Sequence, residues 1–173
     1  MPIKKITVAF EFPLSPIKLS ADWEPGEHER EAAWEMYVEL ATRVTVVELP
    51  ADRGLVREAL NSYYSLFATT REILKKYGPK VARPQGKGST SFGQLAIVIL
   101  NELLRPFLSE WHPALQDWET RRGEQESSLS HERSWKHHGE IRDALERTRV
   151  QLELYASYLA EVAEVPTLGT LAG

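Results

Sequence analysis

An arginine and a histidine with four residues between them, Arg133 and His138, stand where a polar stretch gives way to a long amphipathic segment. A second pair, Arg105 and His112, has six residues between its members. Histidine transfers protons near neutral pH, and arginine stabilises a phosphorane without losing its own charge. Both pairs therefore contain the residue types that metal-independent cleavage of a phosphodiester needs.

This spacing resembles that of small helical-bundle ribonucleases of the HEPN class, in which about four to six residues separate the arginine from the histidine at a helix start. The resemblance implies a ribonuclease that uses Arg133 and His138, with Arg105 and His112 as the second choice. With five histidines in the chain, about one such match is expected by chance. His138 also continues the apolar stripe that passes through Ile141, so a structural role is the simpler interpretation.

The bulk composition excludes several other classes. A net charge of −4 argues against a nucleic-acid binder that works by bulk charge, and the absence of cysteine excludes disulfides and thiolate metal sites. Adjacent histidines on a helix point about 100° apart, so His137 and His138 are not expected to share a metal ion. The stretch 86–89 lacks the preceding glycine of a phosphate-binding loop, and we expect no cofactor. With no signal sequence and no apolar run long enough to span a membrane, we expect a cytoplasmic protein.

Apolar periodicity predicts a mainly α protein, a four-helix bundle with an N-terminal extended strand or arm. Ile6, Val8, Phe10 and Phe12 alternate with polar residues and predict a half-buried strand. We expect an arm over 1–24, a bundle over 25–166 and a tail over 167–173. The helices are expected over 25–47, from an N-cap at Asp52 to Gly78, from Thr90 or Ser91 through kinks at Pro106 and Pro113, and over 132–164. A flexible basic loop over 78–91 and a polar loop over 120–132 connect them.

The remaining candidates are residues for binding a partner. A lone strand cannot satisfy its own ladder hydrogen bonds, so it must pair with another segment, such as 43–49, or with another chain. Tryptophans gather near one end of the expected bundle, where they fill the core, line an aromatic pocket or form a docking patch. The partner-binding candidates are Trp111, Trp118, Trp135, Arg83, Lys87, Phe10 and Phe12.

Three stretches together carry a further resemblance: EAAWEMYVELATRV (31–44), LNELLRPFLSEWHPALQDWE (100–119), and HERSW (131–135) leading to LELYASYLAEVAEVP (152–166). They resemble an uncharacterised family of small bacterial helical proteins. The resemblance implies a setting beside bacterial conflict and antiviral-defence genes, and it implies no activity or site residues.

These observations favour a non-catalytic helical module that binds another protein chain, a second copy or a different protein, within a defence or signalling assembly. The alternatives are the ribonuclease described above and a small-ligand sensor whose pocket is lined by the three tryptophans.

Overall fold

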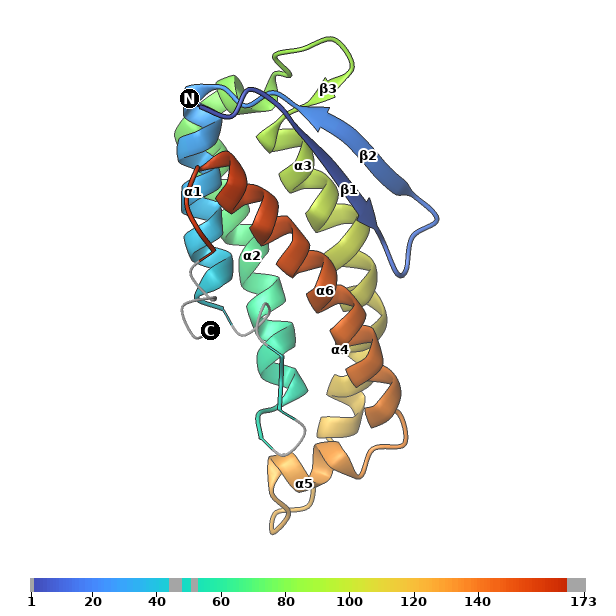
Figure 1. The fold of residues 1–173 in the computed structure, drawn as a ribbon. Coiled ribbons are helices and arrows are strands. Elements are labelled where there is room, and N and C mark those ends of the chain that lie inside the picture. The colour runs from blue at the N-terminus through green and yellow to red at the C-terminus, as the bar shows by residue number, and fades with distance from the viewer. Residues whose placement is uncertain (1, 44–47, 51–52, 168–173) are drawn as a thin grey trace.

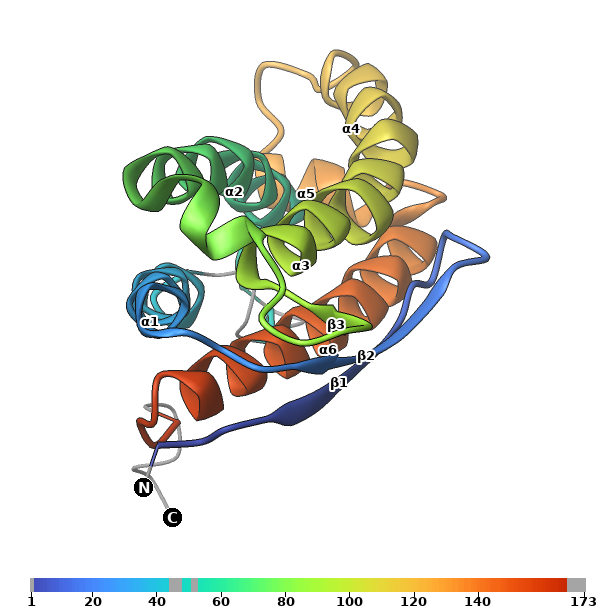
Figure 2. The same ribbon diagram turned by 90° about the horizontal axis from the view of Figure 1, so that it is seen from above.

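The computed structural model describes residues 2–43, 48–50 and 53–167, and its fold is mainly helical with a small three-stranded sheet formed near the N-terminus (Figure 1). Helix α6 packs against α1 and α4, α2 packs against α1 and α4, and the β1–β2 hairpin lies along α6 (Figure 2). The elements in chain order are β1 (Ile6–Glu11), β2 (Lys18–Trp23), α1 (Glu27–Ala41), α2 (Val56–Tyr77), the 3₁₀ turn η1 (Gly78–Ala82), β3 (Ser89–Thr90), α3 (Phe92–Val98), the π-helical segment η2 (Ile99–Leu104), α4 (Arg105–Glu119), α5 (Ser128–Arg133) and α6 (His138–Val162).

The predicted N-terminal strand is present, and its alternation is confirmed because its even-numbered residues are buried. Its partner differs from the prediction. β1 pairs antiparallel with β2, from Ile6 opposite Trp23 to Glu11 opposite Lys18, and β3 adds parallel to the far end of β2. The residues after Pro13 form a turn and a second strand rather than an extended arm. We had proposed the segment 43–49 as the partner of this strand, and residues 44–47 of that segment lie outside the described residues.

The segment predicted as a flexible loop over 78–91 contains two short elements, one at each end. Gly78 ends α2 as predicted, with a positive φ of 70° that glycine adopts without strain. The chain then forms η1, and at the other end of the segment β3 joins the sheet. The sequence did not indicate β3, because a two-residue strand has no periodicity to reveal it.

The central apolar segment forms one continuous helical stretch through α3, η2 and α4. It begins where predicted, since the Ser91 hydroxyl accepts the Gln94 N–H as N-cap. The missing amide hydrogen of Pro106 is accommodated by the wider π turn of η2 just before it, whereas Pro113 lies exposed inside α4 and does not break the helix. The helix is not buried on every side, because Ile97 is 48% exposed.

Two predicted helix bounds differ from the structure. α1 ends at Ala41 with Thr42 as C-cap, short of the predicted end at residue 47, and the predicted N-cap Asp52 lies outside the described residues. The last helix is divided: α5 falls partly inside the predicted polar loop, and α6 starts at His138 rather than 132. The predicted stripe of α6 is confirmed, because its members are all buried: Ile141, Leu145, Thr148, Leu152, Tyr155, Leu159 and Val162.

A buried carboxylate ties the sheet to the helices. Glu29, in the first turn of α1, is 1% exposed. One of its oxygens accepts hydrogen bonds from the Trp23 indole N–H at 2.9 Å and from the Phe92 main-chain N–H at 2.8 Å, and the other accepts from the Gly26 N–H at 2.9 Å. The end of β2 and the starts of α1 and α3 therefore meet on one fully hydrogen-bonded group.

The stretch Phe92–Glu119 is the one part of the described chain that is long and apolar enough to cross a membrane, judged by length and composition. Half of its most apolar part is buried within this fold, as in the core helix of a globular protein.

Candidate functional site

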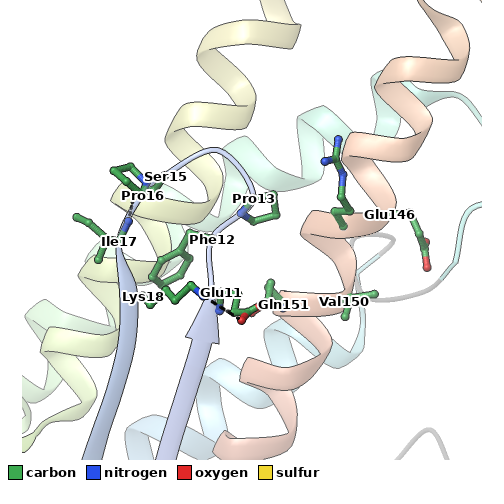
Figure 3. A pocket seen from close by; sticks show the side chains of 11 residues that line it. Glu11, Phe12, Pro13, Ser15, Pro16, Ile17, Lys18, Glu146, Val150 and Gln151 are labelled. Carbon is green, nitrogen blue, oxygen red and sulfur yellow. Dashed lines mark hydrogen bonds and ion pairs between the residues drawn. The ribbon is translucent and has the colours of Figure 1, made fainter.

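A groove of about 480 Å³ lies between the β1–β2 turn and the middle of α6 (Figure 3). The turn contributes apolar side chains and prolines to one wall, and α6 contributes the other wall. The lining residues are Glu11, Phe12, Pro13, Ser15, Pro16, Ile17, Lys18, Glu146, Arg147, Val150 and Gln151. We call this site the hairpin groove.

The turn has a defined shape because three hydrogen bonds hold it. The Ser15 N–H donates to the Phe12 carbonyl at 3.2 Å, and the Ile17 N–H donates to the Ser15 hydroxyl at 3.3 Å. That hydroxyl donates to the Glu102 carboxylate of η2 at 2.8 Å, which anchors the turn to the helical body. Pro13 and Pro16 cannot donate ladder hydrogen bonds, and the strand pairing ends at Glu11 and Lys18 without reaching them.

Exposed apolar side chains gather at this groove. Ile17 and Val150 line it and are 48% and 45% exposed, and Leu14 at the tip of the turn is 40% exposed. Large apolar residues that remain in water at one place favour a site where another molecule covers them.

The rim of the groove carries both signs of charge. Lys18 and Glu11 form an exposed ion pair at 3.6 Å. The Arg149 guanidinium hydrogen-bonds the Glu146 carboxylate at 2.7 and 2.8 Å and lowers the pKa of that carboxyl, so Glu146 is charged at neutral pH. Arg147 adds a positive charge on the same turn of α6. An apolar floor with a mixed, charged rim is the composition of a protein-recognition surface.

Side chains of α6 also close the free edge of β1 beside the groove. The Ala9 N–H donates to the Tyr158 hydroxyl at 3.1 Å, and that hydroxyl lies 3.3 Å from the Ala9 carbonyl, to which it donates. The Glu11 N–H donates to the Gln151 side-chain oxygen at 3.0 Å (Figure 3). The outer edge of β1 is thus hydrogen-bonded along this stretch without a neighbouring strand.

The predicted partner-binding residues fall in different environments. Phe10 and Phe12 are buried, at 3% and 4% exposure: Phe10 packs edge-on against Tyr158, and Phe12 lines the hairpin groove. They support the groove from beneath rather than presenting exposed rings. Arg83 and Lys87 are exposed before β3, away from the groove.

The three predicted tryptophans are packed against the core. Trp111 and Trp135, each 7% exposed, meet edge-to-face at 6.2 Å, and Trp118 stacks on His131 at 4.5 Å between ring centres while its indole N–H donates to the His131 carbonyl at 2.8 Å. None of these three rings lines the hairpin groove or the polar pocket described below. Trp111 and Trp135 belong to the core, and Trp118 packs against it.

The structure separates Arg105 from His112. The Arg105 guanidinium lies over the Phe67 ring at 5.1 Å, and its Nε–H donates to Asn101 at 3.2 Å. His112 lies two turns further along, about 10 Å along the helix axis. Its Nδ1 instead accepts a hydrogen bond from Arg57 at 2.8 Å.

Sequence reasoning missed this Arg57 contact, because Arg57 is on α2 and has no spacing relation to α4. Arg57 also donates from Nε to the Glu119 carboxylate at 2.7 Å. Since arginine is always protonated, Nδ1 of His112 must be the unprotonated nitrogen of its ring.

The other pair, Arg133 and His138, lies beside a second, polar pocket of about 330 Å³. Its lining consists of Leu55, Arg57, Glu119, Arg122, Ser128, His131 and Glu132. His138 Nε2 is 4.0 Å from the Glu132 carboxylate. We call this site the polar pocket.

Glu132 and His138 have pKa values shifted in opposite directions. Burial raises the pKa of Glu132, against the lowering effect of the Val56 N–H that it accepts at 2.9 Å. Burial also lowers the pKa of His138, and the nearby positive charges of Arg142 and Arg133 lower it further. A carboxyl with a raised pKa beside an imidazole with a lowered pKa has the composition of an acid–base pair.

Within the described part of the chain, no three histidines or carboxylates are arranged to hold a metal ion. His137 instead contacts Glu140 at 3.0 Å, and His131 contacts Glu126 at 3.0 Å.

A signal for the hairpin groove was present in the sequence. Val150 is an apolar residue outside the buried stripe of its helix, and Leu14 and Ile17 are apolar residues in a proline-rich turn.

Comparison with family models, curated proteins and solved structures gives no match for this chain, so its function is argued from its own residues and geometry.

Proposed function

We propose that this protein is a non-catalytic binding module that docks a partner protein at the hairpin groove. The observation that carries the proposal is that exposed Ile17 and Val150 line an apolar hollow with a charged rim, while exposed Leu14 lies in the turn that forms one wall. A volume of about 480 Å³ lies within the range of protein binding pockets, roughly 300–1,000 Å³.

The occupant that fits is a short peptide segment of another protein with apolar side chains for the floor. The rim pairs Glu11 with Lys18 and Glu146 with Arg149, and it favours no strongly charged ligand. Charged rim pairs of this kind orient a partner, while the buried apolar contacts supply most of the affinity.

The same proposal includes the wider setting. We interpret the long helices as a four-helix bundle that serves as a rigid support for the hairpin, in a cytoplasmic protein without a cofactor. The resemblance of three stretches to bacterial helical proteins supports a place in a defence or signalling assembly.

Site-specific photo-crosslinking tests the groove. A photoreactive phenylalanine analogue at Val150 is expected to capture the same protein as one at Ile17, and a Leu14→Asp change is expected to abolish both products. The analogue at Trp34, which is 41% exposed on α1, is the matched control and should capture little. Equal capture at Trp34, or capture that survives Leu14→Asp, would contradict the proposal.

A second candidate function, a metal-independent ribonuclease, is favoured by one observation: the opposite pKa shifts of Glu132 and His138 beside Arg133. In this reaction His138 takes the proton of a ribose 2′-hydroxyl, whose oxygen attacks the adjacent phosphorus. Protonated Glu132 gives a proton to the departing 5′-oxygen, which leaves a cyclic phosphate, and Arg133 stabilises the charge on the phosphorane.

Cleavage of a labelled single-stranded RNA in the presence of a chelator tests this second function. His138→Ala should abolish cleavage, while His137→Ala, which changes the neighbouring half-exposed ring, should leave it unchanged. RNA that stays intact with the wild-type protein, or cleavage that persists in His138→Ala, rules out these residues as the catalytic pair.

A further inference from the structure

The two outer edges of the β1–β2 hairpin differ in how far their main-chain groups are hydrogen-bonded to the rest of the protein. The outer edge of β1 is closed, because Tyr158 and Gln151 hydrogen-bond the main chain of Ala9 and Glu11. The outer edge of β2 has a neighbouring strand only at one end, where β3 pairs with Asp22 and Trp23 (Figure 1).

The register identifies which groups of β2 point outward. Ala9 and Glu11 direct their N–H groups away from β2, so the residues opposite them, Ser20 and Lys18, direct theirs away from β1. Within the described part of the chain, no hydrogen bond reaches the outward N–H and C=O groups of Lys18 or Ser20. Three to four residues of β2 thus present an open edge, which is a template for another strand.

The chain's own loop before β3 does not cover this edge. A Cβ atom on Gly86 would collide with the carboxylate of Glu24, so the loop is packed beyond the end of β2. It then turns sharply into β3, with the Ser89 N–H donating to the Gly86 carbonyl at 3.1 Å and Gly88 at a φ of 76°. The space beside Lys18 and Ser20 is therefore left for a segment from outside.

We propose that the partner supplies an extended peptide that adds to the sheet as a strand beside Lys18–Ala21 of β2. This inference rests on the proposed function and states how the partner binds. Main-chain hydrogen bonds to Lys18 and Ser20 hold the strand, and alternate side chains of the peptide decide which sequence is accepted.

The faces of β2 define the chemistry of the peptide. Leu19 and Ala21 point toward the helices and are only partly buried, so apolar residues suit the inner face. Lys18 lies on the outer face, where its one recorded partner is Glu11 at 3.6 Å, so an acidic residue opposite it gains a cross-strand pair. Two copies paired through this edge would instead bring both Lys18 ammonium groups onto one short stretch, which disfavours self-association.

Selection from a displayed library of short linear peptides tests the inference. The expected binders alternate apolar with polar residues and include an acidic residue. Their affinity should fall about tenfold or more for Ser20→Pro, which removes an outward N–H without removing a β1–β2 ladder bond. Thr7→Pro is the matched control, because the Thr7 N–H points to the other edge, and it should bind as the wild type does. Unchanged thermal melting shows that both variants fold.

Amide hydrogen exchange gives an independent reading on the unaltered chain. Bound peptide should slow exchange at Lys18 and Ser20 and leave Thr7 unchanged. Strand addition would be overturned by a library without binders or by binders that are insensitive to Ser20→Pro. It would also be overturned by protection at the β1 edge, or by protection that grows with protein concentration when no peptide is present. If binders are lost on Val150→Asp but kept on Ser20→Pro, the hairpin groove stands as the docking site and only strand addition fails.

Discussion

The main-chain N–H of Phe92 donates to the Glu29 carboxylate at 2.8 Å, although the two residues are 63 positions apart. The same oxygen accepts the Trp23 indole N–H, so a single acidic side chain joins the sheet, α1 and α3. The hairpin on which we place the docking site is held to the helical body through this group.

Replacing Glu29 with alanine is expected to lower the free energy of unfolding by about 3 kcal/mol, because two buried N–H groups and one partly buried N–H group lose their acceptor. Urea denaturation followed by far-UV circular dichroism measures this change. Glu27→Ala, an exposed carboxylate in the same helical turn, should change stability by less than about 0.5 kcal/mol. Equal effects of the two changes would show that the shared carboxylate does not join these elements.

Tyr158→Phe is expected to open the outer edge of β1. The loss of the hydroxyl that bonds both the N–H and the carbonyl of Ala9 should cost about 1 kcal/mol and speed hydrogen exchange at the Ala9 amide. Tyr64→Phe removes an exposed hydroxyl on α2 and serves as the control. Unchanged exchange at Ala9 in Tyr158→Phe would mean that the hydroxyl does not protect the edge.

His138 should make the fold sensitive to acid. Burial, with Arg142 and Arg133, lowers its pKa in the folded state below the ordinary 6.5. A lowered folded-state pKa gives stability that is present above about pH 6.5 and is lost as the pH falls through the folded pKa. Wild type should therefore lose stability relative to His138→Gln in a series of urea titrations toward lower pH, whereas His137→Gln should follow wild type.

Glu132 should act with the opposite sign. Burial raises its folded-state pKa above the ordinary 4.5, so the protonated form is favoured in the folded protein. Its contribution is fully present below about pH 4.5 and is lost as the pH rises through the folded pKa. Relative to Glu132→Gln, which keeps an acceptor for the Val56 N–H, wild type is expected to become less stable as the pH is raised above that range. A difference between the two proteins that stays constant with pH would contradict the raised pKa.

The parts of the fold that follow a local period were predictable from the sequence. The buried side of β1 and the stripe of α6 follow from alternation and from steps of three and four. The pairing of β1 with β2 was not predicted, because Pro13 and Pro16 suggested an arm and hid the alternation of Leu19, Ala21 and Trp23. Strand pairing and the short β3 depend on contacts between segments, which a local pattern does not contain.

The candidate sites were predicted less well, for the same physical reason. The Arg133–His138 spacing did not indicate the nearby carboxylate of Glu132, because that carboxylate is positioned by its burial against α2 and not by spacing along one helix. His112 meets Arg57 rather than Arg105, because helices pack side by side and bring distant residues closer than residues two turns apart. The hairpin groove depends on which apolar residues stay exposed, and exposure follows from the complete fold.

The π-helical segment Ile99–Leu104 sets the rotational phase between the two halves of the central helix. A π turn holds about one residue more than an α turn, and each residue of a helix corresponds to about 100° of rotation. Deleting one residue there would rotate all of α4 against α3, carrying Trp111 out of the core and moving His112 away from Arg57. The length of this one segment is consequently under tighter constraint than its apolar side chains, since it aligns the far end of the molecule with the near end.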